Sequence, residues 1–123
     1  MTAPSLHRVI VSVAEMGRAL AFYEGVLGLV QRNAPPGFAV LTLPVGDGGG
    51  QRVELMLHER TAHPSMAGVA LSLRVADVDA VLAAAEGVGC TVIDRPNDQP
   101  WGERLAVLAD PDGHVICLAT ARA

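Results

Sequence analysis

The amino-acid sequence predicts an α+β protein made of two copies of a βαβββ module. Three observations support this prediction: segments in which apolar and polar residues alternate as in a β-strand, two segments with helical spacing of apolar residues, and an internal repeat. The repeat relates residues 13–16 (VAEM) to residues 75–78 (VADV), and residues 24–26 (EGV) to residues 86–88 (EGV). Both matches are 62 positions apart (75 − 13 and 86 − 24), about half of the 123 residues. We interpret the repeat as a duplication that produced two modules.

The first module is predicted to span residues 7–58. Alternating valines indicate its first strand, and apolar residues at helical spacing, with Gly28 just past the end, indicate its helix. Glycine-rich residues 45–50 are typical of a hairpin turn between the last two strands. The predicted order is a strand at 7–13, a helix at 15–27, and strands at 29–33, 38–44 and 51–58.

The second module is predicted to span residues 69–120, after a linker at 59–68. The turn at 110–113 (DPDG) has proline second and glycine fourth, which suits type I geometry. The two modules would form a single domain, residues 1–123. The predicted order in the second module is a strand at 69–75, a helix at 77–86, a strand at 90–94, a loop at 95–102, and strands at 103–109 and 114–120.

Composition excludes several classes of function. Half of the residues are hydrophobic, so the chain is not disordered. The net charge is −4 and no basic stretch stands out, so we expect neither a nucleic-acid partner nor a membrane partner. No long apolar run or signal-peptide pattern is seen, so we expect a cytoplasmic protein in which Cys90 and Cys117 are reduced thiols. All nine basic residues are arginines, which excludes a Schiff-base lysine.

Alternation assigns two faces to each sheet. One face carries apolar rows, such as Val53, Leu55 and Leu57, that should pack on the helices. The opposite face is too polar to be part of a core. It carries Arg8, Ser12, Glu54, His58 and Arg74. That face could line a ligand cavity, or it could be a plain solvated sheet face.

Several motifs in order resemble one known family. The first is residues 11–19 (VSVAEMGRA), leading into Phe22-Tyr23 and residues 26–29 (VLGL). The closing motifs are residues 100–104 (PWGER), 110–114 (DPDGH) and 116–118 (ICL). Together they resemble the vicinal oxygen chelate superfamily, which includes glyoxalases, bleomycin resistance proteins and extradiol dioxygenases. The resemblance implies that the modules form a curled mixed sheet, a half-barrel around a ligand pocket, with helices on the outer face and completion in a homodimer.

Enzymes of this family hold a divalent metal through side chains on the first and last strands of each module. Matched to the family pattern, these positions fall at Arg8 and Glu54 in the first module, and at Ala70, 62 residues after Arg8, and Cys117 in the second. An arginine offers no lone pair and an alanine offers no ligand, so we expect no metal and no other cofactor. His58 lies too far along its strand from Glu54 to share an ion, and His7 should point away from Arg8 unless the register slips.

The resulting hypothesis is metal-independent binding of a small organic molecule, as the resemblance to bleomycin resistance proteins implies. Arg8 should pair with Glu54 in place of a metal. Two alternatives stay open: a divalent-metal-dependent lyase, isomerase or dioxygenase with non-standard ligands, and a dimeric interaction module without a ligand. No catalytic residue is predicted, and whether a reaction is catalysed is left open. The predicted ligand-binding residues are Arg8, Ser12, Glu54, Met56, His58, Ser72, Arg74, Trp101 and Cys117.

Overall fold

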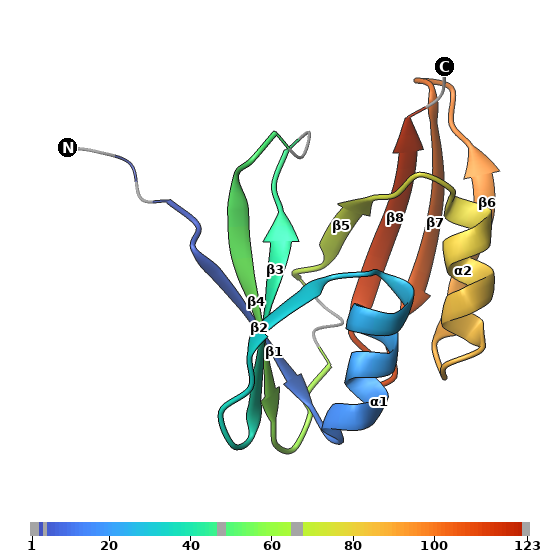
Figure 1. The fold of residues 1–123 in the computed structure, drawn as a ribbon. Coiled ribbons are helices and arrows are strands. Elements are labelled where there is room, and N and C mark those ends of the chain that lie inside the picture. The colour runs from blue at the N-terminus through green and yellow to red at the C-terminus, as the bar shows by residue number, and fades with distance from the viewer. Residues whose placement is uncertain (1–2, 4, 47–48, 65–67, 122–123) are drawn as a thin grey trace. The chain divides into compact units, whose positions relative to one another are not determined.

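The computed structural model describes residues 3, 5–46, 49–64 and 68–121, and the chain divides into two compact units, residues 1–62 and 63–123 (Figure 1). Each unit holds one four-stranded sheet in which parallel and antiparallel pairs are mixed. The predicted α+β class and the pair of βαβββ modules are therefore confirmed. Among the described residues, no helix has the length and apolar character needed to cross a membrane.

The sheet of the first unit has the strand order β1-β4-β3-β2. Strand β1 runs parallel to β4, while β3 pairs antiparallel with both β4 and β2. The helical segment lies between β1 and β2 along the chain, and α1 contacts β4. The elements are β1 (Arg8–Val13), α1 (Met16–Leu20), η1 (Ala21–Val26), β2 (Val30–Asn33), β3 (Phe38–Pro44) and β4 (Arg52–Glu59).

The helix of the first unit begins at two carboxylates and changes pitch halfway. Glu15 is the N-cap and accepts hydrogen bonds from two backbone N–H groups of the first turn, while Glu59 accepts one from Met16 N at 2.7 Å. The second half, η1, is a π-helix, in which Leu27 N donates to the carbonyl of Phe22. Phe22 and its neighbour Tyr23 are both fully buried. Residues 16–26 are thus helical, one residue shorter at each end than the predicted 15–27, and the π-helical half has a wider turn than an α-helix.

The sheet of the second unit has the strand order β5-β8-β7-β6. Helix α2 is capped by Asp77, whose carboxylate accepts a hydrogen bond from Ala80 N, and it packs on β6, β7 and β8 (Figure 1). Asp110 lies in the turn after β7, where its buried carboxylate accepts hydrogen bonds from two backbone N–H groups. The elements are β5 (Leu71–Arg74), α2 (Val78–Glu86), β6 (Thr91–Asp98), β7 (Glu103–Ala109) and β8 (Val115–Ala121).

One predicted loop is partly wrong. Residues 95–98 belong to β6, which continues to Asp98, whereas the sequence predicts a loop from residue 95 onward. The ladder between β6 and β7 shifts register between Asp94 and Asn97, and this irregularity accommodates Pro96, which has no N–H to donate. As the edge strand of its sheet, β6 is mostly exposed, so its polar composition did not indicate a strand.

The predicted faces of the sheets are confirmed. Val11 and Val13 of β1 are buried, as are Val53, Leu55 and Leu57 of β4. In β8 of the second unit, Ile116 and Leu118 are buried. The predicted hairpin at 45–50 closes through a hydrogen bond from Val45 N to the carbonyl of Gln51, although residues 47–48 lie outside the described residues. The opposite face of the first sheet therefore presents its polar row, which includes Glu54.

Candidate functional site

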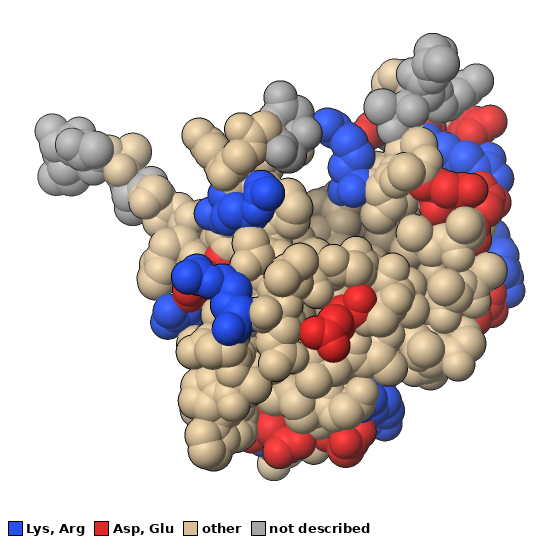
Figure 2. Space-filling model, viewed as in Figure 1, with Lys and Arg blue, Asp and Glu red and all other residues tan. Residues whose placement is uncertain are grey.

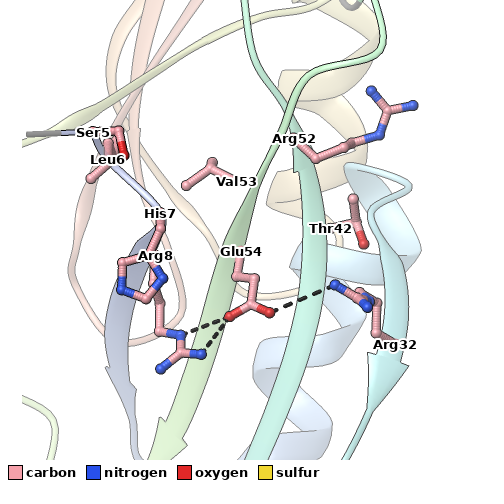
Figure 3. Close-up of a pocket in the computed structure, with 9 residues that line it drawn as sticks. All are labelled: Ser5, Leu6, His7, Arg8, Arg32, Thr42, Arg52, Val53 and Glu54. Carbon is pink, nitrogen blue, oxygen red and sulfur yellow. Dashed lines mark hydrogen bonds and ion pairs between the residues drawn. The ribbon is translucent and has the colours of Figure 1, made fainter.

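An ion pair joins the first and last strands of the first unit. The parallel register of β1 and β4 places Arg8 directly across from Glu54. Nε of Arg8 donates to Oε1 of Glu54 at 2.8 Å, and Nη2 lies 2.6 Å from the same oxygen (Figure 3). The predicted pair is therefore present, with both contacts on one carboxylate oxygen. The side chains are about one-third exposed, 35% for Arg8 and 27% for Glu54.

A second arginine approaches the other oxygen of Glu54. Arg32 lies in β2 at a β-bulge, where the register with β3 shifts between Gln31 and Asn33. Its Nη1 lies 3.7 Å from Oε2 of Glu54, although β3 separates the two strands. Thr42 of β3 is the cross-strand neighbour of Glu54. A polar row therefore crosses all four strands of the sheet, from Arg8 through Glu54 and Thr42 to Arg32.

This row lies in an open pocket of about 440 Å³ at one end of the first sheet. The close-up shows the side chains of Arg8 and Arg32 on either side of Glu54, while the side chain of Arg52, at the start of β4, extends away from this group (Figure 3). The space-filling view shows basic side chains gathered over the strands of the first unit (Figure 2). The lining residues are Ser5, Leu6, His7, Arg8, Arg32, Thr42, Arg52, Val53 and Glu54.

The surrounding cations keep Glu54 ionised. The hydrogen bond from Arg8 lowers the pKa of Glu54 below its ordinary value of 4.5, and the charges of Arg8, Arg32 and His7 act in the same direction. Partial burial opposes this shift, since desolvation disfavours the charged carboxylate. The net effect is a lowered pKa, so Glu54 is an anion at neutral pH.

The position of His7 differs from the prediction. Alternation along the first strand predicts that His7 points away from Arg8, yet both residues line the same pocket. Strand β1 begins only at Arg8, so His7 lies before the regular alternation starts. The alternative of a slipped register is wrong, because Val11 and Val13 remain on the buried face.

The remaining predicted residues of the first unit continue the same face of β1 and β4. Ser12 lies across from His58, whose ring stacks on Phe38 with a centroid separation of 4.4 Å. Met56 lies across from Ile10, which is 63% exposed and gives this face an apolar segment. The first unit therefore combines a charged end with an apolar and aromatic surface.

The predicted residues of the second unit form a separate group. Ser72 of β5 lies across from Cys117 of β8. Arg74, two residues after Ser72, lies on the same face of β5. Cys117 is thus paired with Ser72 and not with Ala70, so the two expected metal positions of this module do not face each other. Trp101 is not on this row: it lies in the turn before β7, is 65% exposed, and its Nε1 donates to Glu103 at 2.6 Å.

The other cysteine is unsuited to nucleophilic chemistry. Cys90 is buried, and desolvation together with the charge of Asp110 raises the pKa of its thiol to about 12. The reactive form of cysteine is the thiolate, so Cys90 is protonated and unreactive at neutral pH.

The residues at the expected metal positions do not fit a divalent ion. The guanidinium of Arg8 is hydrogen-bonded to the one carboxylate of the set, and Ala70 offers no donor atom. Within residues 3, 5–46, 49–64 and 68–121, no three His, Cys, Asp or Glu side chains are grouped so that they could hold a metal. The donor chemistry at these four positions therefore differs from that of a divalent-metal site.

Comparison with known proteins identifies the family. Residues 5–118 match the Glyoxalase/Bleomycin resistance protein/Dioxygenase superfamily, and the chain belongs to that superfamily. The resemblance drawn from the sequence motifs is thus confirmed.

Individual relatives cover the chain to different extents. "Putative glyoxylase CFP32" of Mycobacterium bovis is 35% identical over 106 residues, which are 80% of this chain and 37% of that protein. "Uncharacterized protein Mb0911c" of the same species is 48% identical over 46 residues, 37% of this chain and 30% of that protein. The chain therefore spans about a third of the length of these curated relatives. A glyoxalase-related enzyme from Fulvimarina pelagi shares the fold, with a TM-score of 0.79 at 16% identity over 96% of this chain and 88% of that one.

The lowered pKa of Glu54 predicts a pH dependence of stability. Because the folded-state pKa lies below the ordinary 4.5, the carboxylate stabilises the fold above that pH, and the contribution is lost as the pH falls through the folded-state value. Urea unfolding of the wild type and of Glu54→Gln should show a constant difference at neutral pH that shrinks in acid. A difference that does not change with pH would contradict this interpretation.

The ion pair predicts non-additive substitutions. Glu54→Leu leaves the arginines of the pocket without a carboxylate, so it should lower the melting temperature by a few degrees, more than Arg8→Met does. Combining it with Arg8→Met removes one of the repelling charges, so the double variant should melt above Glu54→Leu alone.

A matched control is the exposed pair of Arg95 and Glu86 in the second unit, joined at 3.3 Å. Arg95→Met and Glu86→Leu should have small, nearly additive effects, because exposed pairs contribute little. Additive costs for Arg8 and Glu54 as well would show that their pairing is energetically unimportant.

Proposed function

We propose that this protein binds a small organic molecule without a metal ion, on the polar face of its sheets. The observation that carries the proposal is the pairing of Arg8 with Glu54 at the positions where enzymes of the superfamily place metal ligands. The pair supplies fixed charge and unused N–H donors where a metal would supply open coordination positions.

The surroundings of the pair support reversible binding. The pocket volume of about 440 Å³ is within the range of small-molecule sites. The neighbouring surface of Ile10 and Met56 offers apolar contact, and the stacked rings of Phe38 and His58 offer an aromatic one. Such a combination of one charged end and one apolar surface orients an amphipathic molecule. Sequestration of a drug or metabolite requires no more than this.

A second candidate is a metal-dependent lyase, isomerase or dioxygenase with ligands outside the expected positions. The name of the relative "Putative glyoxylase CFP32" favours an enzyme, since that protein is 35% identical over 80% of this chain. The donor chemistry at Arg8 and Ala70 argues against it.

Metal titration separates the two candidates. A ligand that binds the folded state at a hundred times its Kd stabilises it by about 2.7 kcal/mol, enough to raise the melting temperature by several degrees. We expect that magnesium, manganese, zinc and nickel raise the melting temperature of neither the wild type nor Glu54→Ala. A stoichiometric metal in the purified protein that is lost in Glu54→Ala would overturn the proposal.

We also propose that the protein acts as a homodimer. Each sheet has two edge strands, and edge strands expose backbone groups that natural proteins cover or pair. On the edge strand β1, Ile10 is 63% exposed, which leaves an apolar side chain for a second copy to cover. Light scattering coupled to size exclusion should give twice the chain mass of 12.8 kDa. A monomer at tens of micromolar would contradict this proposal without affecting the one on ligand binding.

A further inference from the structure

The pocket of the first unit has an excess of positive charge. Three arginines, Arg8, Arg32 and Arg52, line it together with one carboxylate, that of Glu54. The whole chain carries a net charge of −4, so this excess is local and does not follow from a basic composition. Such a concentration of one sign of charge in a hollow attracts ligands of the opposite sign.

Two of these arginines retain unused donors. Arg8 directs Nε and Nη2 to Glu54, but the contact of Arg32 with Glu54 is 3.7 Å, longer than a hydrogen bond, and its side chain is 63% exposed. Arg52 donates to the carbonyl of Gln51 at 3.2 Å and pairs with no carboxylate in the part of the chain that the structure describes.

Two arginines of the second unit illustrate a guanidinium whose N–H donors are taken up by carboxylates. Arg104 of β7 donates to both oxygens of Asp79, at 2.8 and 3.0 Å, and to Asp98 at 3.1 Å. Arg95 contacts both oxygens of Glu86, at 3.3 and 3.4 Å. Among the described residues, Arg32 and Arg52 have no carboxylate at hydrogen-bond distance, although each guanidinium carries five N–H donors and no acceptor.

We infer that the pocket binds the oxyanion group, a carboxylate or a phosphate, of a small organic ligand through Arg32 and Arg52. This inference rests on the proposed function and names the class of ligand for it. Guanidinium groups match oxyanions in geometry and charge, and the hydroxyl of Thr42 lies on the same face as a further donor. Glu54 does not repel the anion strongly, because Arg8 already neutralises it.

The pocket is larger than an oxyanion alone requires. Its volume of about 440 Å³ leaves room for an organic body beside the charged group. A cationic ligand would instead face the two unbalanced arginines. The ligand class is therefore an organic acid or a phosphate ester.

The test is calorimetric titration with three probes of similar shape: benzoate, phenyl phosphate and the neutral benzamide. We expect one or both anions to bind saturably and at least about fivefold more tightly than benzamide, and to weaken as salt is added. Tighter binding of phenyl phosphate would assign the ligand to the phosphate esters, and tighter binding of benzoate to the carboxylic acids.

Variants locate the binding to the pocket. Arg32→Gln and Arg52→Gln should each weaken anion binding about fivefold or more, while Arg95→Gln, on the second unit, should leave it unchanged. Thermal melts of the variants confirm that each is folded before it is titrated.

Three results would overturn the inference: no binding of either anion, equal binding of benzamide, or equal losses in Arg95→Gln and the two pocket variants. Binding of benzamide without preference for the anions would still agree with the proposed function. That function is tested separately by the dependence on metal. Failure of the inference and failure of the proposed function are thus distinguishable.

Discussion

The parallel pairing of β1 with β4 is the constraint on which the candidate site depends. This register sets Arg8 across from Glu54 and, at the same time, Val9 across from Leu55 and Val11 across from Leu57. A shift of one residue would turn the valines to the polar face and the charged pair into the core. The hydrophobic burial of one face therefore holds the ion pair in position on the other. The pair itself need not stabilise the fold to be retained there.

Much of the fold can be predicted because strands with one buried face have a period of two. The boundaries of β3 and β7 agree with the sequence pattern, and alternation predicts the buried residues of β4 and, in β8, Ile116 and Leu118. The small Ala119 of the opposite row is buried as well. Alternation of apolar and polar residues fails to predict an element when neither of its faces is buried. Strand β6 lies at an edge and has polar residues on both faces, so its sequence does not alternate. The π-helix η1 depends on backbone hydrogen bonds, which the residue types of the segment do not predict.

The site is predicted less completely than the fold. Arg8 and Glu54 can be paired because the family resemblance makes the first and last strands of the module neighbours and places these two residues at facing positions. Alternation places Arg52 on the same face of the strand as Glu54. This position alone does not predict that Arg52 lines a pocket. Arg32 could not be found, since it reaches Glu54 from a bulge, and bulges break the alternation on which the prediction relies. Cys117 lies across from Ser72 and not from Ala70, and the first and last strands of the second module pair one residue out of the register seen in the first module.

The use of arginine alone as the basic residue has a consequence for the character of the pocket. An arginine side chain stays protonated under all conditions in which the protein is folded, whereas a lysine in a desolvated hollow can lose its proton. The chain has no lysine, so the positive charge contributed by Arg8, Arg32 and Arg52 is the same in mildly acidic and in alkaline surroundings. Of the four charged residues that line the pocket, Glu54 is therefore the one whose charge changes in acid. For the ligand binding that we propose, the guanidinium charges of the pocket are thus constant as the pH changes.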